Sequence, residues 1–184
     1  MKVVLHICCG VCAAGAAETL KVEGHEVIGF FYNPNIYPVE EYHRRLEAAQ
    51  KVARELNFRL EAGPYSPEEW LQETDSLKDE PEGGKRCQVC FRIRLEKTYQ
   101  RMINCNADAF TTTLTIGPQK SATIINTIGQ EVGGEKFLVR DFKKKDGFKK
   151  AIQSAKRWGL YRQTYCGCKY SLRQPSQECD KSHS

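Results

Sequence analysis

The chain has 184 residues, of which 40% are hydrophobic, and a net charge of +5. This length and composition are typical of one globular domain, and no apolar run approaches the roughly 20 residues that a membrane span requires. The first apolar run, residues 3–5, indicates a strand rather than a signal peptide. We therefore expect a cytoplasmic protein with no membrane partner. The modest positive charge permits an RNA partner without requiring one.

Strands and helices are predicted to alternate along the chain. Apolar runs predict five strands, at residues 2–7, 25–32, 58–61, 109–113 and 136–139. Amphipathic stretches predict six helices, over residues 10–23, 39–56, 67–77, 87–103, 118–132 and 148–158. This alternation favours an α/β fold in which helices cover both faces of a parallel sheet. We expect a five-stranded, doubly wound three-layer sandwich in one domain, residues 1–172, followed by a polar C-terminal tail, residues 173–184.

Nine cysteines are the most informative residues of the sequence, because clustered cysteines in a reducing compartment usually bind metal or perform redox chemistry. Two motifs carry candidate ligands, Cys8-Cys9-x-x-Cys12 and Cys87-x-x-Cys90. The first motif follows the first strand, at the edge where open α/β sheets bind ligands. Each motif opens a predicted helix, whose positive end favours the thiolate form of cysteine.

Four thiolates suit either a tetrahedral zinc ion or an iron–sulfur cluster. The adjacent residues Cys8 and Cys9 favour the cluster, because neighbouring residues seldom point at one small ion. We predict a [4Fe–4S] cluster held by Cys8, Cys9, Cys87 and Cys90. Cys12 is the alternative ligand, or else a buried helix thiol. The competing hypothesis is a zinc ion that fixes the polar loop 78–86 to the sheet.

A third motif, Cys166-Gly167-Cys168, differs from the other two because a single glycine separates its thiols. That spacing allows a strained disulfide in a small ring, and strained disulfides have oxidising potentials. We therefore predict a pair that switches between dithiol and disulfide and stores two electrons. The alternative is a pair of ligands for a second metal. Cys105 and Cys179 belong to no motif and are interpreted as structural or incidental.

Seven motifs, in order and over nearly the whole chain, resemble those of one family. They are His6-x-Cys8-Cys9-x-x-Cys12, Phe31-Tyr32-Asn33-Pro34-Asn35-Ile36, Glu41-Tyr42, Arg86-Cys87-x-x-Cys90-Phe91-x-x-Arg94-Leu95, Thr112-Thr113-Leu114, Asp141-Phe142-Lys143-Lys144 and Tyr161-Arg162-Gln163-x-Tyr165-Cys166-Gly167-Cys168. In these motifs the sequence resembles the cobalamin-independent epoxyqueuosine reductases (QueH-type). One departure is Gly10-Val11 in the cysteine loop, where the family commonly has a proline.

The resemblance implies an adenine-nucleotide-hydrolase-like (HUP-like) fold. It also implies the last step of queuosine biosynthesis, in which the epoxide oxygen of epoxyqueuosine is removed at the wobble position of a tRNA. The implied cofactors are a [4Fe–4S] cluster at the first two cysteine motifs and an additional mononuclear iron with cysteine and aspartate ligands. Cys166 and Cys168 are the implied redox pair. The implied partners are a tRNA that carries epoxyqueuosine and an unidentified electron donor, and we expect a monomer.

The epoxide oxygen needs a Lewis acid or a proton donor when its C–O bond breaks. Asp141 follows the predicted fifth strand and is our candidate for this catalytic role, as a metal ligand or proton donor. The alternative for Asp141 is a helix N-cap or a salt bridge to Lys143 or Lys144. His6 precedes the cysteines inside a strand and is interpreted as a core histidine or a support for the site.

Basic and aromatic residues carry the argument for RNA binding. Lysines and arginines recur from residue 143 to residue 162, interleaved with aromatic side chains, and could contact backbone phosphates. The target base must leave its stack, and the residues expected to bind it are Tyr32, Asn33, Phe91, Arg94 and Tyr165. A solvated helix face is the alternative for the basic residues. The competing functions are a nucleotide-activating sulfur transferase, whose phosphate loop this sequence lacks, and a zinc-stapled RNA-binding module without catalysis.

Overall fold

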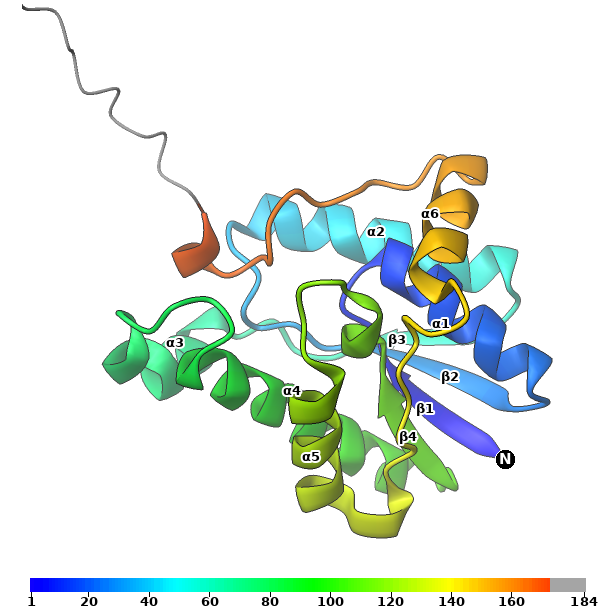
Figure 1. The fold of residues 1–184 in the computed structure, drawn as a ribbon, viewed down its shortest axis with the longest axis horizontal. Helices are drawn as coiled ribbons and strands as arrows, with labels where there is room; N and C mark the ends of the chain where they lie inside the picture. Colours follow the sequence, from blue (N-terminus) through cyan, green and yellow to red (C-terminus); the bar gives the residue numbers. More distant parts are fainter. Residues whose placement is uncertain (173–184) are drawn as a thin grey trace, which may run out of the picture.

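A computed structural model describes residues 1–172 (Figure 1), and the predicted polar tail lies outside the described residues. Its centre is a parallel sheet with the strand order β3-β2-β1-β4. The strands are β1 (Lys2–His6), β2 (Glu26–Phe31), β3 (Arg59–Ala62) and β4 (Ala109–Thr112). Because β1 lies between β2 and β4 and is almost wholly buried, the loop that follows it emerges from the middle of the sheet edge.

The prediction of a fifth strand at residues 136–139 is wrong. These residues overlap η3 (Gly134–Lys136) and, within the described chain, make one isolated bridge to β4. The Leu138 amide donates to the Phe110 carbonyl at 2.8 Å, but the Leu138 carbonyl accepts from the Thr111 hydroxyl, also at 2.8 Å. Beyond the bridge, the Leu138 carbonyl therefore pairs with a side chain of β4, and the described residues show no further ladder bond of a fifth strand.

Helices cover both faces of the sheet, as the alternating pattern predicts (Figure 1). One face carries α1 (Gly10–Val22), α2 (Val39–Glu55) and α6 (Gly147–Arg157). The other face carries α4 (Lys85–Asn104) and α5 (Ala122–Gly133). Beyond the sheet, α4 packs against the short helix α3 (Pro67–Thr74), which continues into η1 (Asp75–Leu77). The three-layer α/β arrangement is therefore confirmed, with four strands in place of five.

Small side chains allow α1 to pack tightly between its neighbours. Ala13 and Ala17 are fully buried, and Gly15 faces α6. A methyl carbon added to Gly15 would lie 2.6 Å from the side chain of Ile116 and 2.9 Å from that of Ala151. The start of α1, and with it the loop that links β1 to α1, is therefore held firmly at the sheet edge.

The chain beyond α6 has no long helix or strand within the described residues. From residue 158 it runs back across α2 toward α3 and reaches η4 (Lys169–Ser171) (Figure 1). This return brings Cys166 to a cavity that Cys8 also lines, although 158 positions separate the two residues in the sequence. None of the described helices is long and apolar enough to cross a membrane.

Candidate metal and redox site

Three thiols at the junction of β1 and α1 form a compact group, with Cys8 and Cys9 before the helix and Cys12 in its first turn. We call residues 8–12 the thiol loop. The sulfur atoms of Cys8, Cys9 and Cys12 lie within 4.8 Å of one another, so this group could hold a metal ion. Cys9 is the N-cap of α1, and its sulfur accepts from the Cys12 amide at 3.4 Å. Gly10 is needed where α1 begins, because a methyl carbon there would lie 2.7 Å from the side chain of Ala48.

Hydrogen bonds in the thiol loop favour a thiolate at Cys8. Bonds from the Cys12 and Cys9 thiols hold the pKa of Cys8 well below its usual value. The contact with Cys8 is also the main reason why the pKa of Cys12 is raised well above its usual value. The Thr113 hydroxyl donates to the Cys8 sulfur at 3.2 Å and accepts from the Cys8 amide at 3.1 Å. Thiolates are the soft ligands that zinc and iron–sulfur clusters use.

A second group of thiols lies at the start of α4. Cys90 is buried beside Trp70 and Cys168, and this burial raises the pKa of Cys90 to about 11. Cys87 is half-buried, its pKa is raised by burial, and its sulfur accepts from a backbone amide of the preceding loop at 3.2 Å. Neither α4 thiol belongs to the compact group of the thiol loop, and both lie close enough to Cys166 and Cys168 to interact electrostatically.

The two C-terminal thiols have different surroundings. Cys166 is half-buried and lines a cavity, whereas Cys168 is 6% exposed and packs in the small apolar cluster at the start of α4. Both are free thiols. Cys105 is half-buried at the end of α4, where its thiol donates to a carbonyl of the same helix at 3.5 Å. The remaining cysteine, Cys179, lies outside the described residues.

The thiol loop and the C-terminal segment meet at one cavity of about 610 Å³. Three of the residues predicted to bind the substrate line it: Asn33, Arg94 and Tyr165. The other two, Tyr32 and Phe91, do not line the cavity. Both are buried in the hydrophobic cluster between the sheet and α4, where Tyr32 stacks on Phe30 at 6.0 Å between ring centroids. The structure thus places these two aromatic residues in the core.

Arg94 places a buried positive charge among the thiols. Its Nε donates to the Cys90 carbonyl at 3.2 Å and its Nη1 to Asn33 Oδ1 at 3.4 Å, while Nη2 has no partner among the described residues. Burial opposes the charge of Arg94, but the nearby thiols, chiefly Cys90 and Cys166, raise its pKa. Lys120 lines the same cavity, and its pKa is also raised by thiols despite burial. Arg94 and Lys120 are therefore two of the basic residues that line the cavity beside its thiols, together with Arg45 and Arg162.

Asp141 does not line the cavity. Its carboxylate accepts from the Lys143 amide at 3.2 Å and lies 3.8 Å from the Lys143 ammonium. The strand expected to carry Asp141 to the sheet edge does not form. The contact with the Lys143 ammonium corresponds to the salt bridge that was the alternative interpretation of Asp141. His6 is fully buried, its ring nitrogens pair with the Thr112 hydroxyl and the Tyr32 carbonyl, and burial lowers its pKa to about 4. It is therefore a neutral core histidine.

Comparison with known proteins identifies the family. Residues 3–174 match the family model described as Epoxyqueuosine reductase QueH. The chain belongs to the QueH family. Curated relatives of that name from Streptococcus pyogenes serotype M1 and Thermotoga maritima are each 38% identical to it. The alignments cover 94% of this chain and 71% of the first relative, and 92% of this chain and 90% of the second. The resemblance drawn from the seven motifs is confirmed.

Solved structures extend the comparison of this QueH-family chain to its fold. The U34-tRNA thiolase NcsA from Methanococcus maripaludis, solved with its [4Fe–4S] cluster, has a TM-score of 0.58 at 17% identity. That match covers 94% of this chain and 62% of the thiolase. NMN synthetase from Francisella tularensis has a TM-score of 0.53 at 14% identity over 93% of this chain and 68% of the synthetase. At such identities the likeness establishes the α/β fold with a parallel sheet.

Three residues at the site have no role in the sequence-based prediction, although two of them belong to the quoted motifs: Thr113, Lys120 and Gln163. The first two follow β4. Since β1 and β4 are parallel neighbours, the loops after them meet at one sheet edge, and that rule applied to the second loop would have identified both residues. The Gln163 amide donates to the Cys9 sulfur at 2.9 Å. Its signals in the sequence are its nearness to Cys166 and its place in the motif that begins at Tyr161.

Proposed function

We propose that this protein reduces the epoxide of epoxyqueuosine at the wobble position of a tRNA and so forms queuosine, the last step of queuosine biosynthesis. The observation that carries the proposal is one cavity in a QueH-family chain that both the thiol loop and the C-terminal thiols line. The reaction consumes two electrons and two protons and converts the epoxide into an alkene and water. The site must therefore store electrons, bind the base and supply protons to the oxygen.

The number and type of thiols fit an iron–sulfur cluster. The thiol loop groups three sulfur atoms within 4.8 Å, and further free thiols lie on α4 and on the C-terminal segment. A structural zinc site needs only four ligands. We propose a [4Fe–4S] cluster held by Cys8, Cys9, Cys87 and Cys90. Cys12 is the alternative ligand. In support, Cys8 and Cys87 pack against the same hydrophobic cluster. When bound, such a cluster would supply electrons one at a time.

The additional mononuclear iron implied by the resemblance has less support from these residues. It would require an aspartate ligand together with cysteine. No aspartate of the described residues lines the cavity, and Asp141 is held by Lys143. The donor set therefore does not fit this second metal, and the proposed reaction assigns it no step.

Cys166 and Cys168 are proposed to deliver two electrons together. Formation of a disulfide between them releases two electrons and two protons, which balance the loss of the epoxide oxygen as water. Cys166 lines the cavity and is the thiol that would face the substrate, while the buried Cys168 would complete the disulfide. An electron donor, proposed as a low-potential reductant, must then restore the dithiol.

Polar residues of the cavity are proposed to bind the base. Asn33 and Arg94 line the wall, and the unpartnered Nη2 of Arg94 is a donor available to the substrate. Tyr165 offers an aromatic ring, on which an extruded base could stack. Arg94 and Lys120 place positive charge where the epoxide oxygen becomes negative as its C–O bond breaks. Tyr32 and Phe91 would need to leave the core to contact the base, so their part is confined to packing.

The position of α6 supports tRNA as the substrate. Phe148 and Ile152 of this helix line the cavity together with Arg162. Lys149 and Lys150 of the same helix are exposed. Phosphates of the anticodon stem could therefore contact α6 while the wobble base leaves its stack and enters the cavity.

The decisive experiment begins with anaerobic purification and analysis of metal, sulfide and the absorbance spectrum. We expect about four irons with matching sulfide, and formation of queuosine when the reduced protein meets tRNA that carries epoxyqueuosine. Digestion of the tRNA to nucleosides and mass spectrometry detect the product. A Cys105→Ala variant is the matched control, because Cys105 lies at the far end of α4 from the site. One zinc, no sulfide and no queuosine would instead support the zinc-stapled RNA-binding module.

A further inference from the structure

Arg45 of α2 connects the helix to the segment that carries the C-terminal thiols. Its side chain is 3% exposed, and its Nε donates to Glu41 Oε1 at 2.7 Å. The other two nitrogens leave the helix: Nη1 donates to the Cys166 carbonyl at 2.9 Å and Nη2 to the Tyr165 carbonyl at 3.0 Å. A planar guanidinium suits this task, because its donors can reach two successive carbonyls while a third pairs with a carboxylate.

Further contacts hold Tyr165 and the next residue after Cys166, Gly167. The Arg45 guanidinium lies 5.3 Å from the centre of the Tyr165 ring, and the Tyr37 amide donates to the Gly167 carbonyl at 2.7 Å. Gly167 has a φ of +119°, a conformation that favours glycine, and a methyl carbon there would lie 2.8 Å from Arg45 Nη1. Three successive carbonyls are thus fixed, and no room remains for a side chain between the two cysteines.

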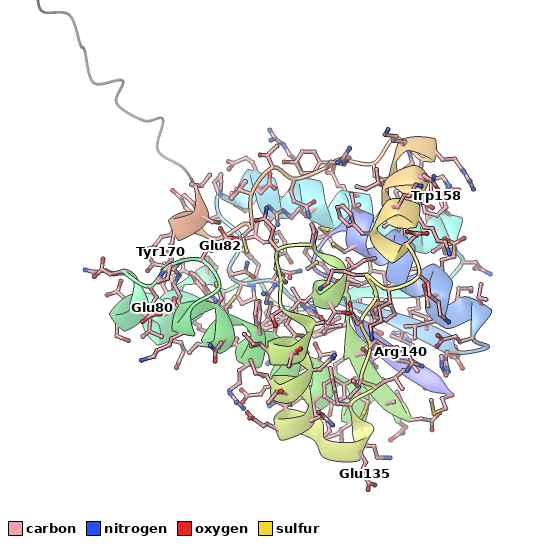
Figure 2. The ribbon with its side chains drawn as sticks, viewed as in Figure 1. Glu80, Glu82, Glu135, Arg140, Trp158 and Tyr170 are labelled. Carbon is pink, nitrogen blue, oxygen red and sulfur yellow. The ribbon has the colours of Figure 1, made fainter. Side chains whose placement is uncertain are left out.

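Another arginine anchors the end of the segment. Arg86 donates to the carbonyl of Glu80, and its guanidinium lies 4.7 Å from the centre of the Tyr170 ring. Figure 2 shows Tyr170 beside the loop that carries Glu80 and Glu82. Since Arg86 and Tyr170 do not depend on α2, the end of the segment remains attached when Arg45 is changed. The part that Arg45 controls is therefore the stretch that contains the two thiols.

These contacts keep the thiols in separate surroundings. Cys166 faces the cavity, and Cys168 packs in the apolar cluster with Cys90. Both are free thiols, so at least one of the two side chains must move before their sulfurs can join. The backbone between the two cysteines is the part whose carbonyls Arg45 and the Tyr37 amide hold.

We propose that Arg45 is a positioning residue that holds the Cys166 and Cys168 thiols apart and thereby favours the dithiol over the disulfide. The proposal rests on the redox role assigned above to this pair. Arg45 lines the cavity, but its hydrogen bonds go to Glu41 and to the Tyr165 and Cys166 carbonyls, and it acts on the thiols through those two carbonyls. Loss of its grip makes Cys168 more accessible and makes the disulfide easier to form.

The central variant is Arg45→Lys, which retains a positive charge beside the buried Glu41 but cannot span two carbonyls. The metal-loaded wild type and variant are equilibrated in mixtures of reduced and oxidised dithiothreitol. Differential alkylation and mass spectrometry then report the fraction of Cys166 joined to Cys168. We expect the equilibrium in Arg45→Lys to shift at least about tenfold toward the disulfide, equivalent to about 30 mV for two electrons.

A second measurement tests whether Arg45 holds the thiol-bearing segment in place, and it does not depend on redox chemistry. In the fully reduced protein, the rate at which N-ethylmaleimide alkylates Cys168 should rise in Arg45→Lys, while the rate at Cys105 should not change. Arg44→Lys is the matched control, because Arg44 is the exposed neighbour on the same helix and contacts the Tyr161 ring. It should leave both measurements at wild-type values.

Gly167→Ala is a second variant that disturbs the contact between Arg45 and Gly167. It keeps the proposal testable if Arg45→Lys does not fold. Its methyl group would displace the guanidinium, so both measurements should move in the same direction as in Arg45→Lys. Unchanged protection of Cys168 in both variants, each with its normal metal content, would overturn the proposal. A different result is that Cys168 is alkylated faster in the variants, but neither they nor the wild type form the disulfide at any dithiothreitol ratio. That result would support the positioning role of Arg45 and exclude the redox role of the cysteine pair.

Discussion

The thiol loop and the C-terminal thiol segment, residues 166–168, meet at one cavity but are held there by different forces. The thiol loop is the turn between a central strand and a buried helix, so backbone hydrogen bonds of β1 and α1 fix it on both sides. The cysteines of the thiol segment are not held by a long helix or a strand; the Arg45 side chain binds the Cys166 carbonyl, and the Tyr37 amide binds the Gly167 carbonyl. One set of thiols is therefore placed by secondary structure and the other by a few tertiary contacts.

This difference suits the two chemistries proposed for the site. A metal centre needs ligands that stay in place, and a loop between two buried elements provides them. A redox pair must alternate between two bonding states, and a segment held by side chains can change its conformation without disturbing the sheet. Variants of the two regions should consequently fail in different ways.

The largest expected effects come from removing one thiol in each region. Cys8→Ala should lose the visible chromophore and most of the iron, and turnover should fall to background, because Cys8 is a proposed ligand in the compact group. Cys168→Ala should keep the chromophore and also lose turnover, because the disulfide cannot form. Iron and sulfide analysis, the absorbance spectrum and queuosine formation distinguish the two failures. Full activity of Cys168→Ala would remove the redox pair from the mechanism.

A substitution at Gly10 tests whether packing fixes the thiol loop. Gly10→Ala places a methyl carbon 2.7 Å from the Ala48 side chain and 2.8 Å from its backbone carbon. Overpacking of this kind costs about 1–3 kcal/mol, so the free energy of unfolding should fall by that amount and iron content should fall with it. Denaturant unfolding measures the first quantity. Gly117→Ala is the control, because its methyl carbon would lie 3.7 Å from the Leu114 carbonyl oxygen, an ordinary van der Waals contact.

The contrast between the two regions also explains what the sequence could predict. The thiol loop was predictable because it depends on local rules: an apolar strand, a helix rich in alanine and the cysteines between them. Of the residues predicted to bind the base, Asn33, Arg94 and Tyr165 line the cavity. Tyr32 and Phe91 lie in the hydrophobic cluster instead, because an aromatic residue near a strand end fits a buried core as well as a binding site.

Long-range side-chain contacts are the part that local patterns could not reveal. Arg45 binds carbonyls 120 and 121 positions away, and nothing near it in the sequence indicates that contact. The fifth strand is a similar case: residues 136–139 have the composition of a strand, but they make one isolated bridge to β4, and the Leu138 carbonyl pairs with the Thr111 hydroxyl, a side chain 27 positions away. Asp141 follows this segment and does not line the cavity.

A smaller effect is expected from Thr113, the side chain that links β4 to the thiol loop. Thr113→Val keeps the shape of the residue but removes the donor to the Cys8 sulfur and the acceptor for the Cys8 amide. Loss of a hydrogen bond to a metal ligand typically lowers metal affinity about 10–100-fold. Competition with a chelator under anaerobic conditions measures this change. Thr111→Val, an equally buried substitution on β4 that touches no thiol, should retain the wild-type affinity.

The smallest effect concerns Gln163, which lies on the C-terminal segment but contacts the thiol loop. Its amide donates to the Cys9 sulfur at 2.9 Å, and donors to cluster sulfurs stabilise the reduced, more negative state. A hydrogen bond of about 1 kcal/mol corresponds to about 40 mV for one electron. Gln163→Leu should therefore lower the midpoint potential of the bound cluster by about that amount, without loss of iron.

A spectroscopic redox titration of the loaded protein measures the potential directly, independently of turnover. Gln119→Leu is the matched control, because Gln119 also lines the cavity but makes no hydrogen bond to a described thiol. Equal potentials in the wild type and Gln163→Leu would mean that the two regions do not influence one another through this contact. A lowered potential would mean that movement of the C-terminal segment changes the electron affinity of the cluster, and the two kinds of thiol would then be coupled parts of one site.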